Sequence, residues 1–478
     1  MSNHKIHFLY DFVFPNMFLP NAIITEYGIV NYLSSLHASK ATIHQPNILE
    51  KLHGLKDQSI GGILYENAFG RQPNTHTGSH MSSHVYSKYK YFEYTEGSLF
   101  EWQQKIKKYI YPIGMTPYVN DFTGVSTIGS KLNGEYFWKH MSTLALTDAQ
   151  QGKAIIFIDY AQENFIEKSA YCKLHESLEK SGIPKNNIIL AFNSFNATEV
   201  YESWFSEEEQ MLQVRNWPFS MTYTSHHYKM NPSQRMSITE FLETRNTIRN
   251  KHFIFKIRRT RDYRLAFLYK IATDDLLEKA NWSCLTPVEF NENNVLAMQD
   301  KYNFELNSTK VEQLCNLIPH SLDGETGSTY ETVGTWTDQT FCSPLAHKNA
   351  YLYLCSETFI DGEYKSLTEK IFKPIINFQP FLFIAYPGAL ALLHKLGFKT
   401  FAPLIDESYD NELNDVKRLN MIYAELNRIC NMRKEEIHAW YWSMEEILIY
   451  NYNHFLNIWQ DESHTGNLLS YLLMRTKL

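Results

Sequence analysis

The sequence predicts an α/β protein built from two Rossmann-like domains, because its buried strands alternate with helices in two separate stretches. Residues 154–158 are a short continuous apolar run, residues 187–192 are apolar after Asn187, and residues 165–181 between them have a helical pattern. A strand, a helix and a strand at this spacing are typical of a parallel sheet. The same alternation begins again at residues 253–257. A chain of 478 residues is long enough for two or three domains, since domains usually hold about 100–200 residues.

The first domain is expected to span residues 1–250. Its first strand, residues 6–14, is apolar and aromatic and ends at Pro15. The helix at residues 165–181 is followed by Gly182, the residue type that most often ends a helix. Two further helices are expected, at residues 21–36 and 237–249.

The second domain is expected to span residues 251–425 and to begin with a strand, a turn and a helix at residues 253–257, 258–262 and 265–279. Further strands are predicted at residues 350–355, 381–386 and 398–401, and further helices at 369–378 and 389–396, the latter closed by Gly397. A helical pattern starts at Asp415, and residues 426–478 are expected to form a helical tail that crosses back to the first domain.

Composition and charge limit the classes of ligand and location. The formal net charge of −7 argues against broad nucleic-acid binding, which needs a basic face. The six cysteines form no C-x-x-C pair, which argues against a zinc or thioredoxin-type site and favours reduced thiols. The most apolar stretch, residues 374–393, is interrupted by polar residues, proline and glycine, so no integral membrane segment is expected. Because no signal peptide is recognisable, we expect a cytoplasmic protein.

A basic cluster follows the predicted strand at residues 253–257. It consists of Lys256, Arg258, Arg259, Arg261 and Arg264. In open α/β sheets, ligands bind outside the carboxyl ends of the strands, and helix N-termini point backbone N–H groups at anions. Arginine adds forked donors that fit phosphate oxygens. The cluster therefore predicts a phosphate site, with a solvated basic turn as the alternative.

A second polar cluster lies between the predicted strand 350–355 and the predicted helix 369–378. Thr368 or Ser366 would cap this helix. Glu369, in its first turn, can accept hydrogen bonds from the two hydroxyls of a ribose, and Lys370 can reach a phosphate as a point charge. Thr-Glu-Lys alone is an ordinary helix start. Combined with Glu357 after a strand and with the basic cluster, it indicates a nucleotide site.

Other polar motifs are less specific. The carboxylates of the DESYD stretch, residues 406–410, either bind ligand hydroxyls, orient the arginines or cap a surface loop. The adjacent Asp274 and Asp275 do not form an Asp-x-Asp metal motif, and no His/Cys/Asp spacing indicates a metal site. The sequence has neither a G-x-G-x-x-G dinucleotide fingerprint nor a P-loop, which argues against a nicotinamide-dependent enzyme and a kinase.

Residues 356–383, SETFIDGEYKSLTEKIFKPIINFQPFLF, resemble the donor-site signature of GT-B glycosyltransferases, most of all the α1,3-fucosyltransferase-like group. Residues 387–410 are similar to a group of bacterial and viral sugar transferases, and residues 253–264 resemble the phosphate-contacting turn of those enzymes. The resemblance covers about a third of the chain. Two positions depart from the fucosyltransferase pattern: Lys365-Ser366 replaces Asp-Tyr, and Thr358-Phe359 replaces Asn-Ser. These departures leave the donor sugar open.

The resemblance implies two domains facing across a cleft, with the nucleotide-diphosphate sugar held by the C-terminal domain. Glu369 would bind the ribose, Lys370 the diphosphate, and Arg258 or Arg264 a phosphate; Arg261, Glu357 and Thr368 complete the predicted donor site. The resemblance also favours an inverting transfer that needs neither a metal nor another cofactor, because basic residues and helix ends take the place of the divalent ion.

The general base should come from the first domain, because an acceptor hydroxyl must lose its proton as it attacks the anomeric carbon. We favour Asp159 or Glu163, which follow a buried strand, with Asp11, Asp121 and His140 as other candidates. The predicted function is therefore transfer of a sugar to a glycan or other hydroxyl acceptor. A lipid-linked acceptor would bring the protein to a membrane surface. The alternative is a non-catalytic glycan-binding or structural relative with the same fold.

Overall fold

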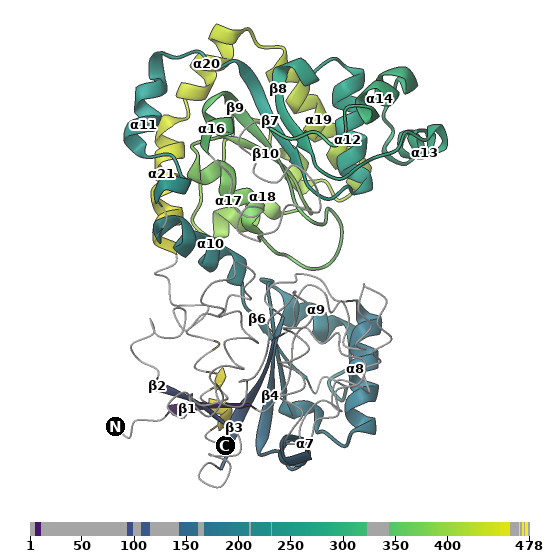
Figure 1. Ribbon diagram of the computed structural model, residues 1–478, viewed down its shortest axis with the longest axis vertical. Coiled ribbons are helices and arrows are strands. Elements are labelled where there is room, and N and C mark those ends of the chain that lie inside the picture. The colour runs from purple at the N-terminus through teal and green to yellow at the C-terminus, as the bar shows by residue number, and fades with distance from the viewer. Residues whose placement is uncertain are drawn as a thin grey trace, which may run out of the picture. The chain divides into compact units, whose positions relative to one another are not determined.

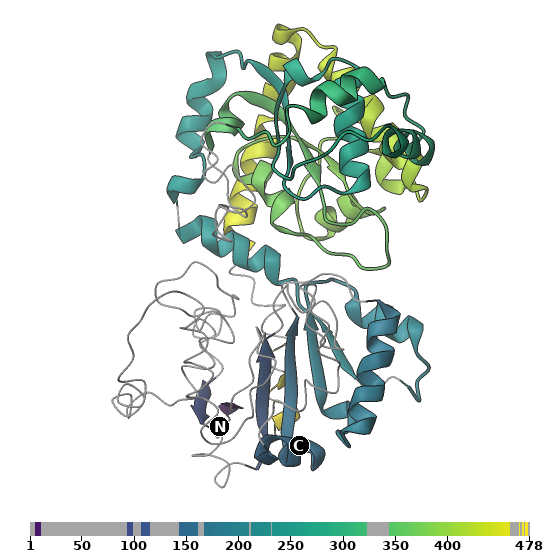
Figure 2. The ribbon, with the colours of Figure 1, turned by 45° about the vertical axis from the view of Figure 1, so that its right-hand side comes forward.

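The computed structural model describes residues 5–10, 93–98, 107–114, 143–160, 167–209, 212–230, 232–322, 344–458, 468, 471–472 and 474–476. The chain divides into two compact units. Unit 1 consists of Met1–Phe219 and Glu462–Leu478, and unit 2 consists of Ser220–Asp461. Each unit contains one parallel sheet with helices packed against it (Figures 1 and 2). The prediction of an α/β chain with two parallel-sheet domains is confirmed.

The sheet of unit 1 has the strand order β2-β1-β3-β4-β5-β6, and every pairing in it is parallel. Its strands are β1 (Lys5–Tyr10), β2 (Glu93–Ser98), β3 (Tyr109–Gly114), β4 (Ala154–Tyr160), β5 (Ile188–Phe192) and β6 (Gln213–Asn216). The helices among its described residues include α7 (Thr143–Gln150), α8 (Lys168–Lys180) and α9 (Ala197–Trp204), with a 3-10 turn at Lys185–Asn187. The predicted strands at the start of the chain and at residues 154–158 and 187–192 are therefore present, as is the helix between the last two.

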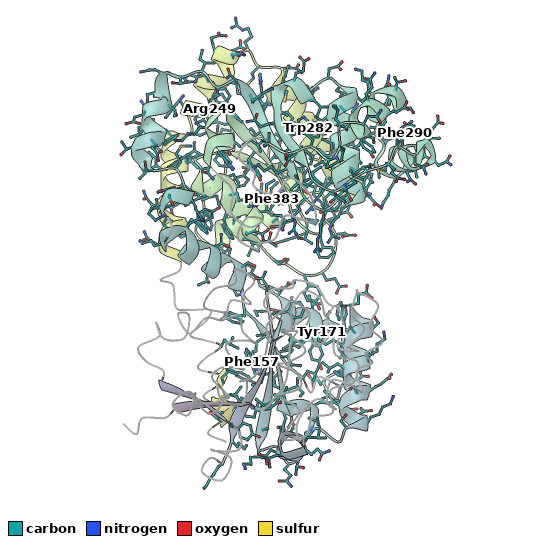
Figure 3. The ribbon with its side chains drawn as sticks, viewed as in Figure 1. Phe157, Tyr171, Arg249, Trp282, Phe290 and Phe383 are labelled. Atoms are coloured by element: carbon teal, nitrogen blue, oxygen red, sulfur yellow. The ribbon has the colours of Figure 1, made fainter. Side chains whose placement is uncertain are left out.

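The apolar runs of β4 and β5 are buried, and each of these strands has a neighbouring strand on both sides in this sheet. Phe157 in β4 and Tyr171 in α8 are both fully buried in unit 1 (Figure 3). The C-terminal segment joins the same unit: the Arg215 guanidinium lies 3.8 Å above the Tyr471 ring, and Leu472 is fully buried. The chain thus returns to its first domain at its end, as the sequence predicted.

The sheet of unit 2 has the order β10-β9-β7-β8, again entirely parallel. Its strands are β7 (Lys251–Ile257), β8 (Ala280–Cys284), β9 (Ala350–Ser356) and β10 (Phe381–Ile384). From β7 the chain first adds β8 on one side and then crosses over to add β9 on the other side. The strand order therefore reverses between β7 and β9, and open α/β sheets bind ligands at such a switch point.

The helices of unit 2 form two layers around this sheet. They are α10 (Phe219–Met230), α11 (Ile238–Glu243), α12 (Asp262–Thr273), α13 (Glu292–Tyr302), α14 (Ser308–Cys315), α16 (Pro344–Lys348), α17 (Glu369–Ile376), α18 (Ala389–Lys395), α19 (Asp415–Cys430), α20 (Lys434–Trp442) and α21 (Glu445–Ile458). Figure 1 shows α21 on one side of the sheet and α12 on the other. Ring contacts join each layer: Phe372 of α17 stacks on Phe455 of α21, and Phe267 of α12 meets Tyr423 of α19. In the described part of the chain, no helix is long and apolar enough to cross a membrane.

The two units divide the chain at different places from the expected boundaries at residues 250 and 425. Residues 220–250 belong to unit 2 because their side chains pack there. Ser225 Oγ donates a hydrogen bond of 2.5 Å to the Phe455 carbonyl, and the Phe241 ring stacks on Phe378 at 4.4 Å. For the same reason α20 and α21 stay in unit 2, and only residues after Asp461 return to unit 1.

Two predicted elements are wrong. The helix expected at residues 237–249 is only α11 followed by a 3-10 turn at Thr244–Asn246, because Ile248 is 44% exposed and does not extend the apolar face. The strand expected at residues 398–401 is absent. Side chains bind its backbone instead: Asn451 accepts from the Lys399 N–H at 2.9 Å, and Glu407 accepts from the Phe401 N–H at 2.7 Å.

The aromatic stack under α11 should carry much of the stability of unit 2. Phe241 is fully buried between Phe378 and Trp442, whose ring centroids lie 4.4 and 4.8 Å away. We expect Phe241→Ala to lower the free energy of unfolding by about 3–5 kcal/mol, because it leaves a cavity. The neighbouring Leu242 is 39% exposed, so Leu242→Ala should cost no more than about 0.5 kcal/mol. Urea denaturation of both variants checks this, and equal losses would contradict it.

Candidate functional site

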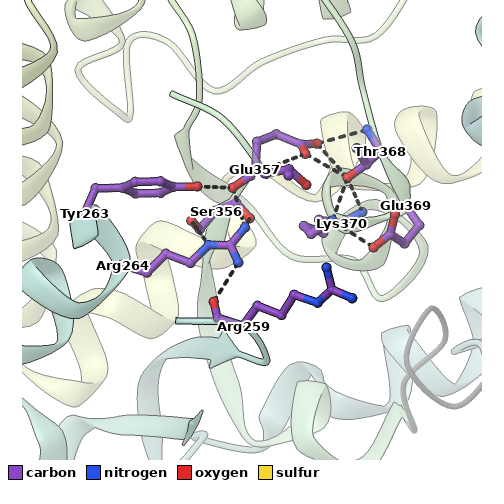
Figure 4. A network of polar contacts seen from close by, with 9 residues as sticks. Arg259, Tyr263, Arg264, Ser356, Glu357, Thr368, Glu369 and Lys370 are labelled. Atoms are coloured by element: carbon purple, nitrogen blue, oxygen red, sulfur yellow. Dashed lines mark hydrogen bonds and ion pairs between the residues drawn. The ribbon is translucent and has the colours of Figure 1, made fainter. Parts of the chain in front are cut away.

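The candidate site lies at the carboxyl ends of β7 and β9, the two strands on either side of the switch point. Phe255 of β7 pairs with Leu354 of β9, so the residues just beyond both strands lie at the same edge of the sheet. After β7 comes the basic turn, Arg258–Arg261, which leads into α12. After β9 come Glu357 and a loop that leads to Thr368 and α17. Figure 4 shows the polar contacts that join these segments.

Arg264, in the first turn of α12, joins the two strand ends. Its side chain is 5% exposed. It donates to Ser356 Oγ at 3.0 Å, to the Ser356 carbonyl at 3.2 Å, and to the Glu357 carbonyl. A further N–H donates to the Arg259 carbonyl at 3.1 Å, and the Tyr263 hydroxyl donates to the Glu357 carbonyl as well. The structure therefore brings together the basic turn and the Glu357 strand end, which lie more than 90 residues apart in the sequence.

The Glu357 carboxylate is buried and holds both ends of the loop that follows it. The residue is 2% exposed. Its oxygens accept from the Thr358 N–H at 3.1 Å and from the Thr368 N–H at 3.0 Å. The Thr368 hydroxyl lies 2.9 and 2.8 Å from the two oxygens. Glu357 thus closes residues 358–367 into a loop with fixed ends, because its carboxylate binds Thr358 at the start of the loop and Thr368 directly after it.

Thr368 is the N-cap of α17, as predicted, and orders the acid–lysine pair that follows. Its side chain accepts from the Lys370 N–H at 3.4 Å. The Lys370 ammonium donates to Thr368 Oγ1 at 3.1 Å and to Glu369 Oε1 at 2.9 Å. About a quarter of each side chain stays exposed, 27% for Lys370 and 23% for Glu369. Both charged groups are therefore fixed in position and still reachable at the start of a helix.

The charges of this pair support each other. Burial alone would raise the pKa of the Glu369 carboxyl, but Lys370 and Lys373 outweigh it and lower that pKa from 4.5 to about 2. Burial would likewise lower the pKa of Lys370, but Glu369 and Glu357 raise it above its ordinary value. At neutral pH the helix start therefore presents one ammonium and one carboxylate.

The three other arginines of the basic turn have different surroundings. Arg261 is the N-cap residue of α12, and its guanidinium lies 4.6 Å from the centre of the Phe359 ring; burial lowers its pKa. Arg258 is half-buried, and its carbonyl accepts a hydrogen bond from the Thr286 hydroxyl. Arg259 is exposed, and its side chain extends from the turn on the side of Lys370 and Glu369 (Figure 4). Arg259 was part of the predicted cluster but was not singled out as a ligand.

The carboxylates of residues 406–410 have structural roles. Asp410 accepts from the N–H groups of Leu390 and Ala391 at 2.9 and 3.0 Å, so it caps the start of α18. Glu407 accepts from the Thr400 hydroxyl and the Phe401 N–H, both at 2.7 Å. Of the three interpretations open at the sequence level, these contacts favour the capped loop.

The predicted general bases remain untested. Asp159 lies near the end of β4, paired with Gly114 and Ala191 on the neighbouring strands. Glu163 lies outside the described residues, as do Asp11, Asp121 and His140. Among the residues that the structure describes, no three His, Cys, Asp or Glu side chains are grouped so that they could hold a metal ion.

One residue that contacts the same loop was missed at the sequence level. Arg418 in α19 is 1% exposed and donates to the carbonyls of Ile360, Ala385 and Glu412 at 2.5, 3.0 and 2.8 Å. It also pairs with Asp415 at 2.5 Å. Its position beside Leu419 and Ile422 on the apolar face of the helix could have identified it, because an arginine on such a face has to be buried and hydrogen-bonded.

Comparisons with known proteins give similarity in structure only. Neither a protein-family model nor a curated protein sequence matches the chain. The N-terminal domain of Candida albicans trehalose-6-phosphate phosphatase is similar over 99% of this chain and 97% of that one, with 11% identity and a TM-score of 0.41. A UDP-forming α,α-trehalose-phosphate synthase from Burkholderia xenovorans, in complex with glucose-6-phosphate, is similar over 98% and 100%, with 10% identity and a TM-score of 0.36.

A third similar structure is trehalose-6-phosphate from E. coli bound with UDP-2-fluoro glucose. It is similar over 71% of this chain and 76% of that one, with 15% identity and a TM-score of 0.31. All three TM-scores lie below 0.5.

The lowered pKa of Glu369 predicts a pH-dependent stability. A carboxyl whose pKa is about 2 when folded and 4.5 when unfolded stabilises the fold fully above pH 4.5. This stabilisation is lost as the pH falls from 4.5 through 2. We therefore expect the difference in unfolding free energy between wild type and Glu369→Gln to shrink over that range, as measured by urea denaturation at stepped pH.

The same series in a Lys370→Met background tests the cause. If Lys370 lowers the Glu369 pKa, most of the pH dependence of the Glu369→Gln difference should disappear in this background. An unchanged pH dependence would show that Lys370 does not set the carboxyl pKa.

Proposed function

We propose that unit 2 binds a nucleoside diphosphate sugar and that the chain transfers the sugar to a hydroxyl acceptor. The observation that carries the proposal is the convergence of the basic turn after β7 and the acid–lysine pair of α17 at one sheet edge. This edge is the switch point of the sheet, where ligands of open α/β sheets bind.

The diphosphate would be held by Lys370, by the start of α17 and by Arg259. Two of the three N–H donors of the Lys370 ammonium are used by Thr368 and Glu369. The third is left for a phosphate oxygen. The backbone N–H groups of a helix start and an exposed guanidinium on the neighbouring turn suit the remaining oxygens. Arg258 and Arg261 add positive charge to the same turn.

The ribose would be held by Glu369. Its carboxylate has about four acceptor positions, and the bond from Lys370 uses one of them. Two neighbouring ribose hydroxyls can therefore donate to it. Because its pKa is about 2, the group stays ionised at neutral pH and accepts strong hydrogen bonds.

The transfer is a displacement at the anomeric carbon. The bond from this carbon to the diphosphate oxygen breaks, and a bond to the acceptor oxygen forms. The acceptor proton passes to a carboxylate, for which Asp159 and Glu163 are the candidates. Negative charge develops on the departing diphosphate, where fixed cations and helix N–H groups stabilise it without a metal. Attack from the face opposite the leaving group inverts the anomeric configuration, and the acceptor is a glycan, free or linked to a lipid.

A nucleotide screen is the first test. A ligand that binds only the folded protein raises its melting temperature as the ligand concentration exceeds the Kd. We expect one of UDP, GDP, CDP and dTDP to stabilise the protein clearly more than the others. If none of them does so at millimolar concentration, the donor-site assignment is wrong.

Substitution of the acid–lysine pair then tests catalysis. We expect Lys370→Ala and Glu369→Ala each to lower turnover of the matching nucleotide sugar by about 100-fold or more, because each removes a group that holds the leaving nucleotide. Lys395→Ala, at an exposed lysine at the end of α18, serves as the control and should keep its activity. Transfer and donor hydrolysis are measured by nucleotide release, and the anomeric configuration of the product by NMR.

The outcomes separate the alternatives. Wild-type turnover in both variants would disprove the assigned roles. Nucleotide binding without transfer or hydrolysis would favour the non-catalytic relative. A product with retained configuration would overturn the inverting displacement and leave the binding site intact.

A further inference from the structure

Arg264 is a buried cation that has no carboxylate partner in the described structure. It is 5% exposed, and the acceptors of its four hydrogen bonds are one hydroxyl and three backbone carbonyls. Buried charges are normally paired, because an isolated charge loses much solvation energy. The nearby Glu357 carboxylate does not pair with it and is bound by Thr358 and Thr368. Among the described residues, no ion pair therefore neutralises the charge of Arg264.

The acceptors of these hydrogen bonds matter for anion binding. Carbonyl oxygens beyond the end of a strand carry partial negative charge, and exposed ones would repel a phosphate. Arg264 covers the carbonyls of Ser356 and Glu357, and Tyr263 covers that of Glu357 a second time. The strand end that faces the site is thereby changed from a repelling into an attracting surface.

We propose that Arg264 is a positioning residue that favours a diphosphate without touching it. Four of its five N–H donors are used inside the protein, so its effect comes from its charge, from the covered carbonyls and from its bond to the basic turn at Arg259. This inference rests on the proposed function, since it concerns the same diphosphate. Arg264 would then not bind the phosphate directly, contrary to the expectation from the sequence. Its contribution to the affinity should grow with the negative charge of the ligand.

Arg418 provides a matched control. It is also buried, it also donates to backbone carbonyls, and one of these, Ile360, belongs to the loop that starts at Glu357. Its charge, however, is paired with Asp415. A substitution of Arg418 therefore disturbs the loop but, unlike a substitution of Arg264, does not remove a positive charge that lacks a carboxylate partner.

The experiment compares the mono- and diphosphate of whichever nucleoside the wild type binds. Kd values are measured by calorimetry, or by competition where binding is weak, for wild type, Arg264→Gln, Arg264→Lys and Arg418→Gln. The readout is the ratio of the monophosphate Kd to the diphosphate Kd. We expect Arg264→Gln to lower this ratio about 10-fold, because a neutral amide can still cover a carbonyl but removes the charge. Arg264→Lys should keep most of the ratio, and Arg418→Gln should weaken both ligands equally.

The possible results lead to distinct conclusions. If this ratio is unchanged in Arg264→Gln, or falls equally in Arg418→Gln, the inference is overturned. Diphosphate binding by the wild type would still support the proposed function. If the wild type binds no nucleotide, the proposed function itself fails. If Arg264→Gln does not fold, Tyr263→Phe decides. It removes one of the two hydrogen bonds to the Glu357 carbonyl at constant charge, so a loss of affinity for the diphosphate alone supports the inference, and equal losses for both ligands refute it.

Discussion

The bonds of Arg264 to the end of β9 are the constraint on which the whole candidate site depends. A parallel sheet places strand ends at one edge, but it does not fix the turns that follow them. Arg264 does so here, because one planar guanidinium binds Ser356, Glu357 and Arg259 at the same time. The basic turn and the Glu357 loop are thus held by a single planar group, whereas a lysine would keep the charge but not all of these bonds.

The loop between β9 and α17 is likewise held in place before any ligand binds. Glu357 closes its two ends, and Arg418 holds Ile360 near its beginning. A loop that is ordered before the ligand arrives does not lose that conformational freedom on binding, so less of the interaction energy is spent on ordering. These bonds come from two separate parts of the chain, the end of β9 and α19, and they hold the loop that leads to Thr368.

The sequence predicted the elements that are determined locally. Strands such as β4, β7 and β9 are continuous apolar runs, and Thr368 before Glu369 is a local capping signal, so both were found. The short helix after Ser237 and the absence of a strand at residues 398–401 depend on distant partners such as Asn451 and Glu407. The role of Arg264 could not be found either, because a basic residue in a turn has the same local pattern whether it contacts a ligand or bonds a strand 90 residues away.

The acidic residues of the site indicate what kind of anion fits it. A site for inorganic phosphate needs only cations and N–H groups, and a carboxylate beside them weakens the attraction. Here Glu369 is ionised and keeps about a quarter of its side chain exposed next to Lys370. Such a group suits a ligand that brings hydroxyl donors close to its phosphates. A ribose attached to a diphosphate has this combination, so the pairing of acid and lysine favours a nucleotide over a simple anion.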